Sequence, residues 1–147
     1  MQRVGRQAAI AAPPERVFAY LADLDNLPSW MAGVVSARRT SSGPVAVGAT
    51  ALVVRELMGQ RIEAPLTVSA HDPPRRLAVE STVSGMHVAI SLDLSANEGG
   101  TDVVVTAEIR GSGLTAFMEP MIASAAGGDL AASLERLRSA LMPTSEN

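Results

Sequence analysis

The sequence predicts an α+β fold in which a seven-stranded antiparallel sheet packs against one long C-terminal helix, with two short helices after the first strand. Three observations lead to this prediction. Between residues 34 and 110, six segments alternate apolar and polar side chains. Short turns separate the segments, which makes successive strands antiparallel hairpins. From Leu114 to Leu141 the apolar residues return to helical spacing.

The first 30 residues predict one strand and two short helices. Residues 4–11 suit a strand, which ends at two prolines because proline donates no backbone hydrogen bond. Proline is also favoured in the first turn of a helix, and the apolar spacing that follows predicts a helix over Pro14–Ala22. Residues 25–30 predict a second short helix, which carries the only tryptophan, Trp30.

Each of the six later strands has one apolar face. In one of them, Met86, Val88 and Ile90 lie on one side and His87 on the other. A single apolar face per strand is typical of a sheet covered on one side only, and the terminal helix is the expected cover. The predicted strands cover residues 34–40, 49–57, 60–70, 76–83, 86–94 and 102–110.

The terminal helix carries two apolar stripes that point in different directions. The Gly127-Gly128 pair lies at their junction, and glycine costs about 1 kcal/mol relative to alanine inside a helix. We therefore expect the helix to bend or break there. The methionine-rich first half is then either a movable gate, or the far side of a fixed kink packed on loops or a twin subunit. One stripe contains Leu130, Leu134, Leu137 and Leu141, and the other Leu114, Met118, Met121, Ile122 and Ala125.

Composition favours one folded domain over residues 1–147, with a frayed tail at 143–147. The net charge of -3 and the scattered arginines disfavour a nucleic-acid partner. The chain has no cysteine, no signal-peptide pattern and no apolar run long enough to span a membrane, so we expect a cytoplasmic protein. Whether it forms a homodimer stays open.

Ordinary catalytic side chains are scarce. The chain has no cysteine, no lysine and two histidines, His71 beside a turn and His87 on the polar phase of a strand. Neither histidine lies at metal-ligand spacing from a second ligand. No phosphate-binding or dinucleotide-binding fingerprint is present. We therefore expect no metal and no cofactor, and we favour binding of a molecule over its chemical conversion.

Several stretches resemble the START-like helix-grip superfamily, in particular its polyketide cyclase/dehydratase-like (SRPBCC) branch. They lie at residues 12–23, 27–33, 47–48, 71–77 and 134–138 and follow the family's order over nearly the whole chain. The resemblance implies a sheet that curls around the long helix and leaves an apolar cavity. Members of this superfamily bind lipids, hormones or polyketides in that cavity, and a minority catalyse cyclisation or dehydration.

Arg55 is the polar residue that the pattern directs inward. A two-residue turn at positions 58 and 59 pairs Arg55 with Ile62, and opposite residues of an antiparallel pair share a face. An inward arginine could hold a carboxylate or an enolate, or it could extend to water at the strand end and bind nothing. Tyr20 and Glu119 are the candidate proton donors or acceptors for an enzymatic alternative.

The favoured function is the binding or carrying of a small hydrophobic or amphipathic ligand, lipid-like or aromatic. The first alternative is a polyketide cyclase or dehydratase that uses Arg55 with Tyr20 or Glu119. The second is a module that docks a protein partner on the exposed methionine-rich half of the helix. The expected ligand-binding residues are Trp30, Val53, Arg55, Leu66, Val79, Met86, Val88, Ile90, Val105, Phe117, Met118, Met121 and Ile122.

Overall fold

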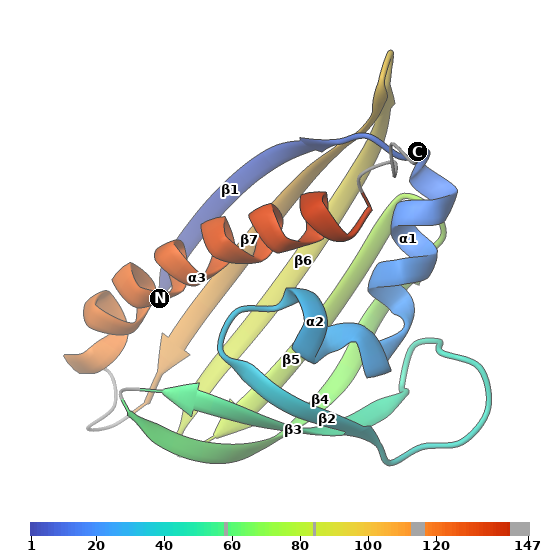
Figure 1. Cartoon of the computed structure of the whole chain (residues 1–147). Helices are drawn as coiled ribbons and strands as arrows, with labels where there is room; N and C mark the ends of the chain where they lie inside the picture. Colours follow the sequence, from blue (N-terminus) through green and yellow to red (C-terminus); the bar gives the residue numbers. More distant parts are fainter. Residues whose placement is uncertain (58, 84, 113–116, 142–147) are drawn as a thin grey trace.

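The computed structural model describes residues 1–57, 59–83, 85–112 and 117–141, and it confirms the predicted α+β architecture. Seven antiparallel strands form one curved sheet, and the long helix α3 lies across its inner side (Figure 1). The strands are β1 (Gln2–Ile10), β2 (Val34–Arg39), β3 (Thr50–Leu57), β4 (Gln60–Asp72), β5 (Arg76–Val83), β6 (Met86–Asn97) and β7 (Gly100–Gly111). The helices are α1 (Pro14–Ala22), the 3-10 turn η1 (Leu24–Asn26), α2 (Leu27–Trp30) and α3 (Glu119–Ala140).

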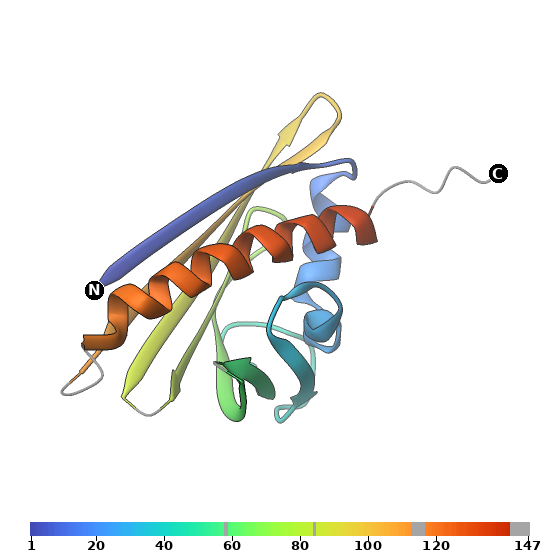
Figure 2. The same cartoon turned by 60° about the vertical axis from the view of Figure 1, so that its left-hand side comes forward.

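The sheet order is β1-β7-β6-β5-β4-β3-β2, so the first strand pairs with the last. All neighbours from β2 to β7 are consecutive in sequence, as the short turns predict. Helix α3 packs against β1, β7 and α2, and Figure 2 shows it running beside β1. Helix α1 packs against β5, β6 and β7. The helices therefore cover the inner side of the sheet from β1 as far as β5.

The core consists of the inner sheet face, the first two helices and the C-terminal half of α3. Fully buried members come from every layer, among them Leu21, Trp30, Val68, Leu92 and Leu137. The alternation that predicts the inner face is confirmed, since Val103, Val105, Ala107 and Ile109 of β7 expose no more than 2% of their surface.

Helix α3 is continuous through Gly127 and Gly128, so the expected bend or break is wrong. The buried face of the helix is one unbroken stripe, at positions 119, 123, 127, 130, 134, 137 and 141. Its first half turns small residues, Ala123 and Gly127, toward the sheet. A Cβ on Gly127 would stand 2.7 Å from Nη2 of Arg6 and 3.3 Å from Cγ1 of Val4. Gly127 therefore permits close approach to β1, which apolar patterning alone does not reveal. The predicted start at Leu114 lies outside the described residues.

A second, smaller apolar cluster lies under the first half of α3. Met86, Ile109 and Ala123 form it, and Val88 and Val4 pack against both this cluster and the main core. The inner side of the sheet is thus divided between two clusters.

Candidate functional site

The pairing predicted for Arg55 is confirmed. In the β3–β4 hairpin Arg55 lies opposite Ile62, two residues beyond the buried pair Val53 and Ala64. Because residues two apart on a strand share a face, Arg55 is on the inner face of the sheet. Neighbouring Glu56 and Arg61 are on the outer face, where an ion pair of 4.0 Å joins them.

The Arg55 guanidinium reaches the loop between α2 and β2. Its Nη2 lies 3.5 Å from the place that a Cβ on Gly33 would occupy, and Oδ2 of Asp129 from α3 lies 3.6 Å from the same place. No hydrogen bond or ion pair joins either charged group to another described residue. Two opposite charges therefore face one position without contacting each other.

Burial decides the electrostatics of Arg55. The side chain keeps some contact with solvent, but its charged group lies deep enough that lost hydration lowers the pKa of Arg55 below its ordinary value. The negative charge of Asp129 raises the pKa and opposes this effect without cancelling it. Since an arginine stays protonated in proteins, the result is a dehydrated cation that has no hydrogen-bonding partner among the described residues.

Asp129 is held in place by the turn of α3 in which it lies. Its carbonyl accepts a hydrogen bond of 2.7 Å from the Ser133 hydroxyl. The same hydroxyl oxygen accepts the backbone N–H of Ala32 at 2.8 Å, which ties the loop after α2 to the helix. Gly33 follows directly, and its carbonyl accepts the N–H of Glu56 at 2.8 Å. These bonds bring the α2–β2 loop, the end of β3 and the middle of α3 together.

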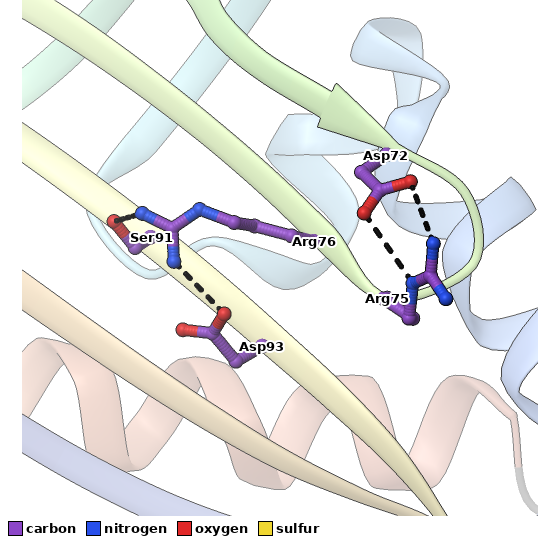
Figure 3. A network of polar contacts seen from close by, with 5 residues as sticks. All are labelled: Asp72, Arg75, Arg76, Ser91 and Asp93. Carbon is purple, nitrogen blue, oxygen red and sulfur yellow. Dashed lines mark hydrogen bonds and ion pairs between the residues drawn. The ribbon is translucent and has the colours of Figure 1, made fainter.

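Arg75 in the β4–β5 turn and Arg76 at the start of β5 are paired in a conventional way. Figure 3 shows Arg76 bound to Asp93 at 2.9 Å and to Ser91 at 3.3 Å, while Arg75 contacts Asp72 at 3.3 Å. Exposed pairs of this kind contribute about 0–1 kcal/mol each. Arg55 differs from them because it is dehydrated and bonds to no residue in the described part of the chain.

The inner face near Arg55 is incompletely buried. Ile62 lies beside Arg55 and keeps contact with solvent, and Val88, three strands away from Arg55 on β6, is half-buried as well. On the helix, Ile122 and Ala126 are half-buried and pack against the smaller cluster. These apolar residues do not reach the full burial of the main core.

The expected lining residues separate into three groups. Five of them, Val53, Leu66, Val79, Ile90 and Val105, belong to the packed main core, with exposures of 1–8%. Met86, Val88, Met118 and Ile122 belong to or pack against the smaller cluster. Phe117 and Met121 differ from the expectation, because they expose 79% and 53% of their surface. The sequence assigned them inward because it could not show that small residues, not methionines, face the sheet.

The other expected residues do not converge on Arg55. Trp30 is 2% exposed and belongs to the main core, and its indole N–H has no acceptor among the described residues. Tyr20 is half-buried on α1, which stands at the right of Figure 1, whereas β3 ends at the left. Glu119 lies ten residues before Asp129, about 15 Å along α3.

Glu119 has a structural role at the start of α3. Its carboxylate accepts hydrogen bonds from the Met1 ammonium group at 2.6 Å and from the Gly111 N–H at 2.8 Å. These two bonds, in that order, lower the pKa of Glu119. A carboxylate fixed in its ionised form by two donors is poorly suited to donate a proton.

His87 lies on the outer face, as the pattern predicts, but His71 differs from the prediction: a register shift after Val68 places it opposite the buried Leu77, on the side that α1 covers. His71 stacks edge-on against Phe18 with ring centroids 5.3 Å apart, and His87 faces Glu80 and Thr82. Among the described residues no group of three His, Cys, Asp or Glu side chains is arranged to hold a metal ion. Within the same residues, no helix combines the length and apolar character needed to cross a bilayer.

Two surface hollows are the best formed in the described part of the chain, and neither contains an expected lining residue. One, of about 340 Å³, lies between β1 and the C-terminal half of α3. The other, of about 390 Å³, lies between α1 and the β4–β5 turn and includes Phe18 and His71. Both are open to solvent. The inner face around Arg55 differs from both hollows because its charged groups are unpaired within the described residues.

Asp129 is the residue of this site that sequence reasoning missed. The spacing of positions 126, 129 and 133 places Asp129 on one face of the helix, beside the leucine stripe, and this spacing could have indicated that Asp129 lies near the sheet. Gly33 was also missed, and its φ of 90° marks a backbone position that favours glycine.

Comparison with known proteins gives the family and the fold. The model of the family described as "Polyketide cyclase / dehydrase and lipid transport" matches residues 1–142. None of the curated proteins is similar to the chain in sequence.

Similar solved structures cover almost the whole chain. TTHA0849 from Thermus thermophilus has a TM-score of 0.81 at 18% identity, covering 99% of this chain and 100% of its own. A START superfamily protein from Mycobacterium smegmatis has a TM-score of 0.80 at 13% identity, covering 95% and 96%. CV1439 from Chromobacterium violaceum has a TM-score of 0.73 at 16% identity, covering 98% and 100%. At these identities the likeness shows the fold alone.

Proposed function

Because the chain belongs to the polyketide cyclase / dehydrase and lipid transport family, we propose that it binds and carries a small amphipathic molecule on the inner face of its sheet. The ligand's polar end contacts Arg55, and its apolar part extends between the sheet and the first half of α3. The observation that carries this proposal is the dehydrated guanidinium of Arg55, unpaired within the described residues, beside apolar side chains that are only half-buried.

The apolar part of the ligand has a defined direction. From Asp129 to Ile122 the helix advances seven residues, about 10 Å. On the sheet side, Val88 packs against the same small cluster as Ile122 and so offers apolar surface opposite this half of the helix. Covering such surface stabilises a complex by about 25 cal/mol per Å² of apolar area removed from water. A short acyl chain or a two-ring aromatic compound matches this length.

Carrying is favoured over catalysis by what surrounds Arg55. The proton donors considered for a cyclase or dehydratase, Tyr20 and Glu119, make no hydrogen bond or ion pair with Arg55 in the described part of the chain. A general acid or base has to lie within hydrogen-bond reach of the reacting group. The arrangement supplies a cationic anchor, the facing carboxylate of Asp129 and an apolar surface, which suffice for binding.

The test uses the neutral apolar fluorophore N-phenyl-1-naphthylamine, whose emission rises in apolar surroundings. We expect saturable binding to the unaltered protein. Val88→Phe on the sheet and Ile122→Phe on α3 enlarge opposite walls of the same space, and each should weaken binding. Two walls are tested so that a folding defect in one variant leaves a second measurement.

Matched controls lie on the outer surface. Phe117→Ser and Met121→Ser change exposed side chains, and binding should persist in both. The proposal is wrong if the outer variants abolish the fluorescence while the inner variants preserve it, because the probe would then report a surface patch. Circular dichroism of each variant confirms that the fold is retained.

A further inference from the structure

Asp129 places a second charge beside the anchor of the proposed ligand. Its Oδ2 and the Arg55 Nη2 lie 3.6 Å and 3.5 Å from one point next to Gly33, yet no ion pair joins them. Neither charged group has a hydrogen-bond partner in the described residues. A donor and an acceptor therefore remain unsatisfied close to the same backbone position.

We propose that Asp129 determines ligand specificity: with Arg55 it selects a neutral polar group that accepts from the guanidinium and donates to the carboxylate. A primary amide or an un-ionised hydroxyl has this chemistry. The proposal rests on the proposed function, because it concerns the polar end of the same ligand. It differs from the carboxylate or enolate expected for Arg55 alone, because the sequence did not show the opposing charge.

A single bridging group could satisfy both charged residues. A donor and an acceptor in proteins are about 2.7–3.2 Å apart, so one small group can contact two partners that are too distant to pair directly. Because residue 33 is a glycine, it places no side chain of its own next to the two charged groups. A Cβ at this position would stand 3.5 Å from the guanidinium, 3.6 Å from the carboxylate and 3.7 Å from the Glu56 carbonyl oxygen.

Charge balance disfavours an ionised ligand at this position. A carboxylate would gain the attraction of Arg55 but would be repelled by Asp129 at a comparable distance. It would also leave the Asp129 oxygens without a donor. A neutral donor–acceptor group satisfies both residues and adds no charge to the interior, which avoids the cost of dehydrating a further ion.

The test compares three decane derivatives that share an acyl chain and differ in the head group: decanamide, decanoate and methyl decanoate. Each displaces N-phenyl-1-naphthylamine from the full chain at neutral pH. The amide accepts and donates, the ester only accepts, and decanoate is ionised. We expect the unaltered protein to prefer decanamide over both others by about tenfold, the effect of one charged hydrogen bond.

Two variants distinguish the contribution of Asp129 from that of Arg55. Asp129→Asn removes the opposing charge with little change of shape, so decanoate should gain affinity relative to decanamide. Arg55→Met removes the guanidinium and keeps the apolar stem, so all three compounds should bind more weakly and decanoate should lose the most, while the amide stays ahead of the ester because it still donates to Asp129. Both residues are partly open to solvent, and thermal denaturation shows whether each variant is folded.

Four results would overturn the inference. They are a preference for decanoate in the unaltered protein, equal affinity for all three compounds, an unchanged head-group order in Asp129→Asn, and an affinity for decanamide that Arg55→Met leaves unchanged. The proposed function fails in a different way, because then none of the three compounds displaces the fluorophore. Displacement by all three with equal affinity supports the proposed function and rejects the specificity.

Discussion

Two adjacent glycines in α3 have opposite surroundings, and replacing each with alanine separates helix propensity from packing. A Cβ on Gly128 has no heavy atom within 4 Å, and the residue is exposed. Alanine is favoured over glycine inside a helix by about 1 kcal/mol. We therefore expect Gly128→Ala to raise the free energy of unfolding by about 1 kcal/mol, and the melting temperature by about 3 °C for a domain of this size.

The same change one residue earlier has to overcome a packing cost. In Gly127→Ala the new methyl group would stand 2.7 Å from the Arg6 guanidinium and 3.3 Å from Val4. The guanidinium is the end of an exposed, flexible side chain and can move, but Val4 is half-buried in β1 and has less freedom. The strain cancels most of the propensity gain, so the net change in unfolding free energy should be close to zero.

Urea denaturation followed by circular dichroism in the far ultraviolet measures both variants. A double variant, Gly127→Ala with Arg6→Ala, removes the nearer obstacle and should recover part of the gain relative to Arg6→Ala alone. The reasoning is refuted if Gly127→Ala stabilises as much as Gly128→Ala, since the close approach of α3 to β1 would then have no energetic consequence. Destabilisation by Gly128→Ala would instead indicate that the helix needs a flexible joint.

Three further predictions concern stability. The pKa of Glu119 is lowered in the folded protein, so its contribution to stability is complete above its unfolded pKa and disappears as the pH falls through the folded pKa. Glu119→Gln should therefore make stability fall less steeply with decreasing pH in the acid range. An unchanged acid dependence would contradict this prediction. Gly100→Ala should prevent stable folding, because its Cβ would overlap the Ile10 carbonyl oxygen. The control Gly99→Ala has open space around its Cβ and should fold normally. Equal melting temperatures of the two variants would refute the clash. Ser133→Ala leaves the Ala32 N–H without its acceptor and should cost about 1–3 kcal/mol in urea denaturation, whereas a cost near zero would show that this link between α2 and α3 is unimportant.

Patterning along the chain predicted the sheet almost completely. Alternation predicted the inner faces of β6 and β7, and a two-residue turn gave the register that directs Arg55 inward. These features depend on local backbone geometry, which neighbouring residues determine. The limits of Pro14–Ala22 and Arg76–Val83 match the prediction.

Helix orientation was harder to predict because small side chains carry no hydrophobic signal. The methionines suggested an inward stripe, but Ala123 and Gly127 face the sheet and let α3 approach β1. The residue opposite Arg55 was missed for a similar reason. Asp129 is far from Arg55 in sequence, and only the packing of α3 against the α2–β2 loop brings the two charges to Gly33.

A crystal structure of the protein with N-phenyl-1-naphthylamine bound would show whether a small molecule binds between the inner sheet face and the first half of α3. We expect the naphthyl ring to contact Val88 and Ile122. Density for the probe only at the outer surface of α3, or only in the hollow between α1 and the β4–β5 turn, would contradict this expectation.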